Sequence, residues 1–260
     1  FSLIYGACGT LYFSELIRIH MGSTVQVLRF FFFLAGMAYK ISIVPFHFMR
    51  SDIIEDSQVS AASFILVIST GTAILMLNVM IYNLFPSIPE IWQKSLFIMA
   101  VITVTVSNLA ALRQKSLMRF LAWTSMAQAG YIIIGIIGRS QAGMAAVIFY
   151  YITFAFSTLA AVGSAAIIRE QSGCSKIEDL KGLYKSNPLI SLVLTVAFLS
   201  LAGIPPLAGF FGKLLVFTAV AEKGFFFLLL TIAPNLLISL YAYLTVIRSI
   251  FTAAEDKPQV

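Results

Sequence analysis

The chain has 260 residues, of which 60% are hydrophobic and 11% are charged, and its mean hydropathy is +0.95. A soluble domain carries roughly 25% charged residues and less than about half apolar ones, so this composition excludes a soluble globular protein and indicates an integral membrane protein. The net charge of +6 does not indicate nucleic-acid binding, because the basic residues lie in short segments between apolar runs. Cys8 and Cys174 stand alone, and we expect both to be packing residues rather than ligands of a metal or cluster.

Eight apolar segments follow one another in the sequence, and a helix needs about 20 residues to cross the hydrocarbon core. The segments are residues 1–17, 30–49, 58–84, 95–112, 120–138, 142–168, 187–221 and 225–250. They are continuous and much longer than the roughly 10-residue alternating strands of a membrane barrel. The sequence therefore predicts an all-α integral membrane protein with about eight transmembrane helices.

An even number of spans places both termini on one side of the membrane, and the loops can then be sorted by their basic residues. One side holds Arg18, Arg29, Lys94, Arg139 and Lys223. The other side holds Arg50, Arg113, Lys115, Arg119, Arg169, Lys176, Lys181, Lys185, Arg248 and Lys257. The more basic side, with both termini, is predicted to face the matrix or cytoplasm.

Besides Arg248 at the end of the last span, three charged residues lie inside the spans. Glu15 is near the end of its span and three residues before Arg18, so we expect an ordinary ion pair at the membrane surface. Lys40 and Lys213 lie deeper, where a charged lysine costs roughly 2.5–3.5 kcal/mol and usually faces a wet interior on an ion or proton path. Burial disfavours the charged form of a lysine and a nearby carboxylate favours it, so a lysine under both influences can exchange a proton. The alternative is a lysine that only pairs with backbone carbonyls at a helix break.

Prolines interrupt the two spans that contain these lysines. Pro45 follows Lys40 by five residues, and the sequence Gly203-Ile204-Pro205-Pro206 precedes Lys213. Proline removes a backbone donor and breaks a helix. Discontinuous helices in corresponding positions of two halves are typical of transporters built from inverted repeats.

The link at residues 175–186 carries Ile177, Leu180 and Tyr184 at helical spacing among charged residues. This pattern predicts a short helix that lies in the membrane interface. A solvated loop is the alternative.

Other polar residues lie near the breaks or within a span. His47 follows Pro45 by two residues, and the ordinary pKa of histidine, about 6.5, suits a proton relay, although a structural role fits equally. Thr124, Ser125 and Gln128 could line a hydrated path, but such side chains also join membrane helices by hydrogen bonds. We favour packing for these three.

Three motifs occur in order over nearly the whole chain. Tyr39-Lys40-Ile-Ser-Ile-Val-Pro45-Phe46-His47-Phe is similar to the pattern FKxSxxPFH, with Asp52 matching an aspartate a few residues later. Residues 112–131 are similar to LxQxxxKRxLAYSSIAHxGY. Residues 201–213 are similar to SLAGIPxxxGFxGK and follow an IEDLKGL segment.

With these motifs the chain resembles the antiporter-like, proton-pumping membrane chains of respiratory complex I, most nearly the chain 2 family, called N in bacteria. These chains are related to multisubunit cation/proton antiporters. The resemblance implies two inverted five-helix repeats joined along a hydrated axis, each with a discontinuous helix and a lysine, for which Lys40 and Lys213 are the matching positions. Residues 1–84 would then be the last three helices of the first repeat and residues 95–250 the second repeat.

The chain also departs from the family pattern. The family's lysine about thirty residues after the first is replaced here by the sequence Ser69-Thr70-Gly71, and its KR dipeptide by Met118-Arg119. Trp123 stands for a tyrosine and Gln128 for a histidine. We therefore expect water, a hydroxyl such as that of Thr70, or a neighbouring residue to serve the middle of the relay, unless this copy pumps differently or not at all.

The family's essential glutamate lies on a helix before the first span of this chain, which resembles the family's sixth helix. We expect a separate chain to supply the early helices and the acid that pairs with Lys40, as in a subunit split between two genes. A trimmed sequence or an internal fragment is the alternative.

The resemblance implies a non-redox, proton-translocating subunit of NADH:ubiquinone oxidoreductase. It implies no cofactor in this chain, with FMN, iron–sulfur clusters and ubiquinone in partner subunits, and contacts with other membrane-arm subunits and lipids. The alternatives are a subunit of a multisubunit cation/proton antiporter and a structural homologue that has lost pumping. Phenylalanine is frequent, with 23 residues, as an AT-rich organellar genome would produce, so we expect the mitochondrial inner membrane, with the bacterial plasma membrane as the alternative.

Overall fold

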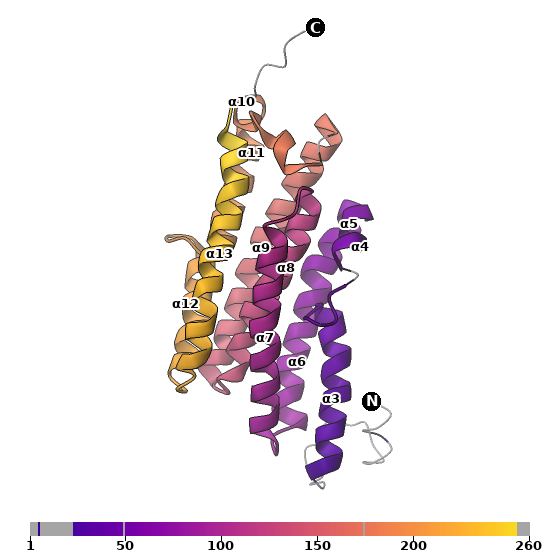
Figure 1. Ribbon diagram of the computed structural model, residues 1–260, viewed down its shortest axis with the longest axis vertical. Helices are drawn as coiled ribbons and strands as arrows, with labels where there is room; N and C mark the ends of the chain where they lie inside the picture. Colours follow the sequence, from indigo (N-terminus) through magenta and orange to yellow (C-terminus); the bar gives the residue numbers. More distant parts are fainter. Residues whose placement is uncertain (1–4, 6–22, 49, 174, 254–260) are drawn as a thin grey trace.

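A computed structural model describes residue 5 and residues 23–48, 50–173 and 175–253 (Figure 1). All named elements of this part are helical. They are α3 (Ser23–Ile41), α4 (Arg50–Asp56), α5 (Val59–Ser63), η1 (Phe64–Ser69), α6 (Thr70–Leu84), α7 (Pro89–Ala111), α8 (Leu117–Ile137), α9 (Gln141–Ser172), η2 (Ile177–Leu180), α10 (Leu183–Ser186), α11 (Pro188–Ala202), α12 (Ala208–Ala221) and α13 (Phe226–Phe251).

The all-α membrane fold is confirmed. In the described residues five helices are long and apolar enough to cross a membrane: the continuous run Val59–Leu84, α7, α8, α9 and α13. Helices satisfy their own backbone donors and acceptors, which lipid cannot do. The first predicted span with Glu15, both chain ends, and Cys8 and Cys174 lie outside the described residues, so the side of the termini stays a prediction.

Helix α8 forms the centre of the bundle, and nearly all of it is buried inside the molecule. It packs against α7, α9 and α12, while α3 and α6 lie towards one side and α11–α13 towards the other (Figure 1). Gly130 shows how closely the helices approach, because a Cβ there would lie 2.7 Å from Val104 Cγ2. Small residues allow such approach between membrane helices. Polar side chains on α8 are therefore withdrawn from lipid.

The span 30–49 is broken, as Pro45 predicts. Helix α3 ends at Ile41 because Ser42 has φ +66° and the Ile43 amide donates to the Ala38 carbonyl at 2.9 Å, the closure of a Schellman motif. Pro45 follows, and α4 begins only at Arg50. Lys40 consequently lies in the last turn of α3 and not at the centre of a span, which corrects its predicted position.

The second break lies where the sequence predicts it, and it closes in the same way. Helix α11 ends at Ala202, Gly203 has φ +85°, and the Ile204 amide donates to the Leu199 carbonyl at 3.1 Å. Glycine suits this left-handed conformation. Helix α12 begins after Pro205 and Pro206, at Ala208, so 187–221 is a discontinuous helix.

The span Val59–Leu84 contains an irregularity that the sequence did not predict. Residues Phe64–Ser69 form a π-helix, and the Thr70 hydroxyl donates to the Ile65 carbonyl, five residues back, at 2.9 Å. Such π segments are rare and occur frequently at functional sites. This one lies beside the first helix break, because Arg50 bonds to the carbonyls of both Ile41 and Leu66.

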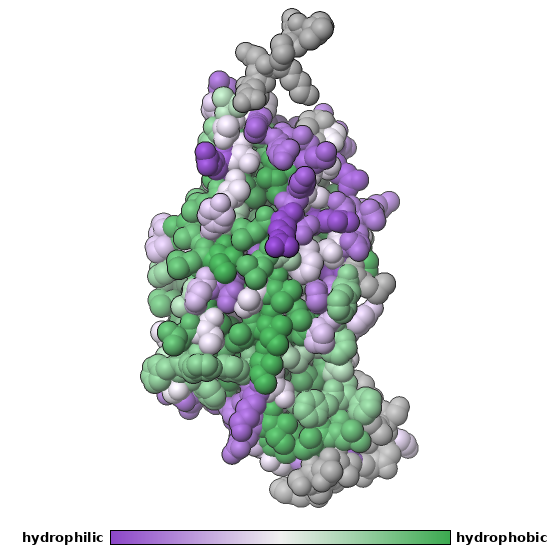
Figure 2. All heavy atoms as spheres, viewed as in Figure 1, coloured by the Kyte–Doolittle hydropathy of each residue, from purple (hydrophilic) through white to green (hydrophobic). Residues whose placement is uncertain are grey.

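The link at 175–186 forms two one-turn helices, η2 and α10, rather than the predicted single helix. Gly182, with φ +79°, stands between them, and its amide donates to the Thr252 carbonyl at 2.8 Å at the end of α13. Figure 2 shows hydrophilic side chains gathered at the end of the bundle that carries α10, with hydrophobic ones over much of the remaining visible face.

Candidate functional site

Lys213 points from α12 back to the end of α11. Its Nζ donates to the carbonyls of Leu201 at 2.8 Å and Ala202 at 2.9 Å, and the residue is only 5% exposed. These carbonyls belong to the negative end of the α11 dipole, which favours a cation. The ammonium also lies 5.1 Å from the centroid of the Tyr131 ring, within the range of a cation–π interaction. Among the described residues no carboxylate forms an ion pair with it.

Gln128 belongs to the same cluster. Its Nε2 donates to the Leu201 carbonyl at 2.9 Å and to the Tyr243 hydroxyl at 3.1 Å, and its Oε1 accepts from the Tyr150 hydroxyl. These three partners come from α11, α13 and α9, so four helices meet at one buried amide. The structure thus brings Gln128 and Lys213 together.

A second set of buried amides extends the polar region towards α7. Asn108 Nδ2 donates to the Tyr131 hydroxyl at 3.2 Å and to the Asn235 carbonyl at 3.1 Å, and Asn235 Nδ2 donates to Thr105 Oγ1 at 3.1 Å. Sequence reasoning missed Asn108 and Asn235. Their signal was available, because each is an amide within a long apolar helix, where polar residues are rare and tend to be functional.

Several buried polar atoms on α7, α9 and α13 have no hydrogen-bond partner among the described residues. They include Ser107 Oγ, Thr158 Oγ1, Asn235 Oδ1 and Ser239 Oγ. Buried polar atoms in native proteins are almost always bonded, often to ordered water. The buried amides and hydroxyls of these helices therefore form a polar layer within an otherwise apolar bundle.

Lys40 lies outside this cluster. Its side chain is exposed and lines a cavity of about 350 Å³ together with Ser42, Ser69, Arg50 and Tyr39. It forms no ion pair within the described part of the chain. The ammonium is therefore open to groups that approach the face of α3.

Arg50 is the main surprise of the site. The sequence predicts a loop at the membrane surface for this residue, but it is only 4% exposed. Its Nη1 donates to the Ile41 carbonyl at 2.8 Å, and its Nη2 donates to Thr70 Oγ1 at 2.7 Å and to the Leu66 carbonyl at 3.4 Å. The loop assignment was wrong because α3 stops at Ile41, so the chain returns to the bundle before Arg50. Arg50 therefore links the end of α3 to the π-helical segment at Thr70.

His47 lies between the break and α8. Its ring stacks on Phe48, with centroids 4.6 Å apart, and meets the edge of Trp123 at 5.5 Å. Its Nδ1 is buried without a hydrogen-bond partner among the described residues. The adjacent Val44 amide donates to Thr103 Oγ1 at 3.1 Å, which fixes the turn against α7.

Ser125 and Thr124 do not join either cluster through the hydrogen bonds that they donate. Ser125 Oγ donates to the Ala122 carbonyl at 2.8 Å, and Thr124 Oγ1 donates to the Phe120 carbonyl at 2.9 Å, both within α8. These contacts are those of membrane-helix hydroxyls that satisfy themselves locally. The packing role of these two hydroxyls stays a prediction.

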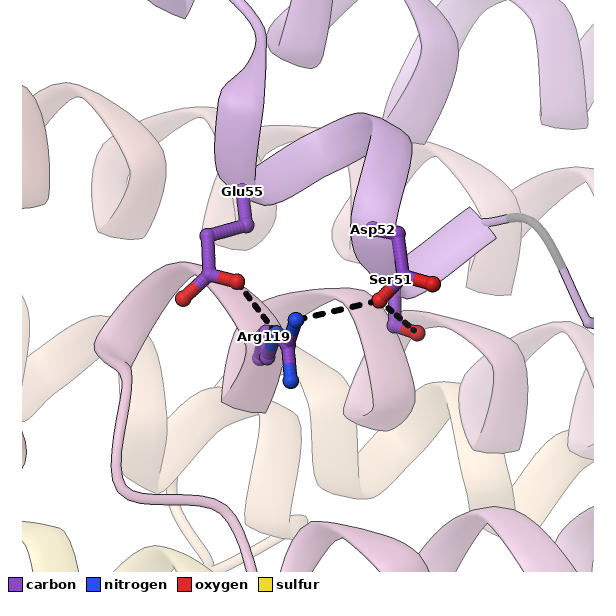
Figure 3. Close-up of polar contacts among 4 residues, drawn as sticks. All are labelled: Ser51, Asp52, Glu55 and Arg119. Carbon is purple, nitrogen blue, oxygen red and sulfur yellow. Dashed lines mark hydrogen bonds and ion pairs between the residues drawn. The ribbon is translucent and has the colours of Figure 1, made fainter.

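Arg119 joins two of the sequence motifs. Its guanidinium lies between two carboxylates of α4: Nη2 is 3.2 Å from Asp52 Oδ1, and Nε donates to Glu55 Oε2 (Figure 3). Arg119 is on α8, so the pair fastens α4 to the central helix. Sequence reasoning singled out Asp52 but missed Glu55, whose spacing of three from Asp52 places both on one helix face.

Helix α9 contacts both the cluster around Gln128 and Lys213 and the π-helical segment η1. The Tyr150 hydroxyl donates to Gln128, whereas the neighbouring Tyr151 hydroxyl donates to the Val67 carbonyl of η1 at 3.4 Å. The Tyr151 ring packs where Gly71 has no side chain, since a Cβ there would lie 1.8 Å from Tyr151 Cε2. Two consecutive tyrosines thus contact the two halves of the site.

The sequence family described as NADH:quinone oxidoreductase/Mrp antiporter, transmembrane, matches residues 1–239. The chain belongs to this family. NADH-quinone oxidoreductase subunit N of Phocaeicola vulgatus is 38% identical over 258 residues, which cover 99% of the chain and 55% of that protein. The chain therefore spans about half the length of this relative.

Solved structures give the same relationship within the family. A chain of respiratory complex I from Thermus thermophilus with bound aureothin matches with a TM-score of 0.80 and 31% identity, over 99% of this chain and 56% of that one. A chain of the Mrp complex from Dietzia sp. DQ12-45-1b matches with a TM-score of 0.90 over 100% of this chain and 48% of that one, at 23% identity, which shows a shared fold. The predicted resemblance is confirmed.

Proposed function

We propose that the chain translocates protons as a membrane-arm subunit of NADH:quinone oxidoreductase, using Lys40 and Lys213 and driven by quinone reduction in other subunits. The observation that carries the proposal is the burial of Lys213 at the break between α11 and α12, within a polar layer from four helices. An ionisable residue inside the membrane is costly and generally functional. Because the chain is related to subunit N of NADH-quinone oxidoreductase, we assign Lys213 to proton translocation.

The unpartnered hydroxyls on α7, α9 and α13 and the unpartnered amide oxygen of Asn235 support a hydrated axis. A buried polar atom without a hydrogen bond costs about 1–3 kcal/mol, and water at Ser107, Thr158 and Ser239 would remove that cost. Such water would give protons a route through α7, α9 and α13 beside Lys213. Gln128 cannot change its protonation, so its role in this route is to orient neighbouring hydroxyls.

Lys40 requires a partner from outside the described residues. A lysine that faces hydrocarbon costs several kcal/mol, and the Lys40 side chain is exposed on α3 without an ion pair among the described residues. An acidic side chain from another helix would neutralise it and share its proton. We place the FMN, iron–sulfur clusters and ubiquinone in other subunits, and the complex in the mitochondrial inner membrane or a bacterial plasma membrane.

The test measures proton translocation per NADH oxidised by the assembled complex in sealed membrane vesicles. Lys213→Met and Lys40→Ala should each lower this yield while the complex still assembles. Lys223→Ala, which removes an exposed lysine just after α12, should leave it unchanged. A normal yield in both Lys40→Ala and Lys213→Met would show a structural homologue without pumping.

A cation/proton antiporter subunit is the second candidate, because the family includes Mrp antiporters and the Mrp chain shares the fold. It predicts Na⁺ movement against a proton gradient in vesicles without NADH oxidation. The oxidoreductase subunit predicts proton movement that depends on NADH and quinone.

A further inference from the structure

We propose that Arg50 is a positioning residue of the proton path: it supplies a permanent positive charge beside Thr70, where the relay of this chain has no titratable group. The inference rests on the proposed function. It concerns a residue that the motifs alone place in a loop.

The position of Arg50 carries the first step of the argument. Its guanidinium reaches three acceptors on two separate segments, namely the last carbonyl of α3 at Ile41, the Leu66 carbonyl of η1, and Thr70 Oγ1. Thr70 itself is 0% exposed. The planar fork of an arginine suits several acceptors at once. The charge is therefore held at one place and does not sample the surface.

The cavity beside Arg50 carries the second step. Arg50 and Lys40 line the same space of about 350 Å³, together with the Ser42 and Ser69 side chains. A water molecule occupies about 30 Å³ in the liquid, so this space holds several. Water in this pocket would bring protons at Lys40 beside the guanidinium of Arg50.

The absence of a countercharge carries the third step. No carboxylate of the described residues forms an ion pair with Arg50, and burying an ion costs several kcal/mol even after relaxation. A neutral amide would satisfy part of the same acceptors without that cost. The hydrogen bonds that join α3 to η1 therefore do not by themselves explain a full charge at this place. An electrostatic effect of the charge on its surroundings explains it better.

Arginine also restricts the mechanism, because it stays protonated under all ordinary conditions. Arg50 cannot pass a proton on as a lysine can. Water in the cavity must carry protons past it, and the fixed charge orients that water and any acid that enters to meet Lys40.

The test uses the assembled complex in vesicles and compares variants that keep or remove the charge. Arg50→Gln removes the charge but keeps a donor, and it should lower the proton yield per NADH as much as Lys40→Ala does. Arg50→Lys, and the double variant Arg50→Thr with Thr70→Lys, keep a cation beside the cavity and should recover the wild-type yield. Arg113→Gln removes an exposed arginine and should have no effect.

Each outcome is decisive. A wild-type yield in assembled Arg50→Gln overturns the inference, as does a yield in both cation-keeping variants as low as that of Arg50→Gln. If Arg50→Gln does not assemble, the two cation-keeping variants decide the question by the same criterion. If Lys40→Ala and Lys213→Met both pump normally, the proposed function fails first, so the two failures are distinguishable.

Discussion

Gln128 and Lys213 donate hydrogen bonds to the same acceptor, the Leu201 carbonyl oxygen, at 2.9 and 2.8 Å. A carbonyl has two lone pairs, so both bonds can form together. The shared acceptor is also one of the last carbonyls of α11, beside the helix break. The position of the Lys213 ammonium is therefore tied to the amide of Gln128.

Replacing Gln128 with leucine should disturb this cluster strongly. The change keeps the volume but leaves the Tyr150 and Tyr243 hydroxyls without one partner each, at about 1–3 kcal/mol per unsatisfied group. We expect a lower unfolding temperature of the purified complex and a reduced proton yield. Ser125→Ala is the matched control, because Ser125 donates only to Ala122 within its own helix. Equal effects of the two variants would contradict a special role for Gln128.

Gly209→Ala should displace the start of α12. A Cβ at this position would lie 1.9 Å from the Ser200 carbonyl oxygen, which belongs to the backbone and cannot rotate away. Overpacking of this kind costs about 1–3 kcal/mol or more, and the shift would move Lys213 with it. The measurement is retention of the subunit in the complex on a native gel as temperature rises.

The control for that experiment is Gly163→Ala in α9. No atom lies within 4 Å of a Cβ built at Gly163, and alanine is favoured over glycine within a helix by up to about 1 kcal/mol. Its retention should equal or exceed that of the wild type. A Gly209→Ala variant that behaves like Gly163→Ala would show that α11 and α12 separate easily.

Thr103→Val should loosen the first break. Thr103 Oγ1 accepts a hydrogen bond from the Val44 amide at 3.1 Å, and valine has the same shape without the acceptor. The amide would lose its partner at a cost of about 1–3 kcal/mol. Hydrogen–deuterium exchange of the segment 42–48 should accelerate. Thr72→Val, at an exposed position bonded only to Ile68 of the same run of helix, should not change it.

The contacts of Arg119 should contribute little to stability on their own. Its side chain is 43% exposed and that of Asp52 65%, with Glu55 at 32%, and exposed ion pairs contribute about 0–1 kcal/mol each. A double-mutant cycle with Arg119→Met and Glu55→Gln, followed by thermal unfolding, should give a coupling within this range that falls as salt is raised. A coupling of several kcal/mol would show that α4 is covered and dry in the complex.

The sequence predicted the second half of the site better than the first. Gly203 and the two prolines after it specify a stop and restart, and Lys213 follows at a distance that allows it to reach the break. Lys213 has features of both alternatives given for it. It pairs with backbone carbonyls at the helix break, and it does so within a polar layer. Periodicity could not show this, because the partners Gln128, Tyr150 and Tyr243 are far apart in the chain.

The first half was misplaced because hydropathy does not register where a helix stops. Ser42 ends α3 by adopting φ +66°, a conformation that is uncommon for residues other than glycine. Pro45 predicts a break within residues 30–49, but nothing in the sequence signals this conformation at Ser42. The loop assignment of Arg50 was a consequence of that error, since a helix continued to residue 49 would have carried Arg50 to the surface.

Each discontinuous helix ends with its carbonyls held by a cation, and the two cations differ in kind. The Ile41 carbonyl at the end of α3 is held by Arg50, and the carbonyls at the end of α11 are held by Lys213. The arginine keeps its charge, whereas a lysine that releases its proton leaves the negative pole of α11 without a counterion. Of these two breaks, therefore, the second can change its electrostatic stabilisation when the lysine changes its charge. The first keeps the same charge throughout.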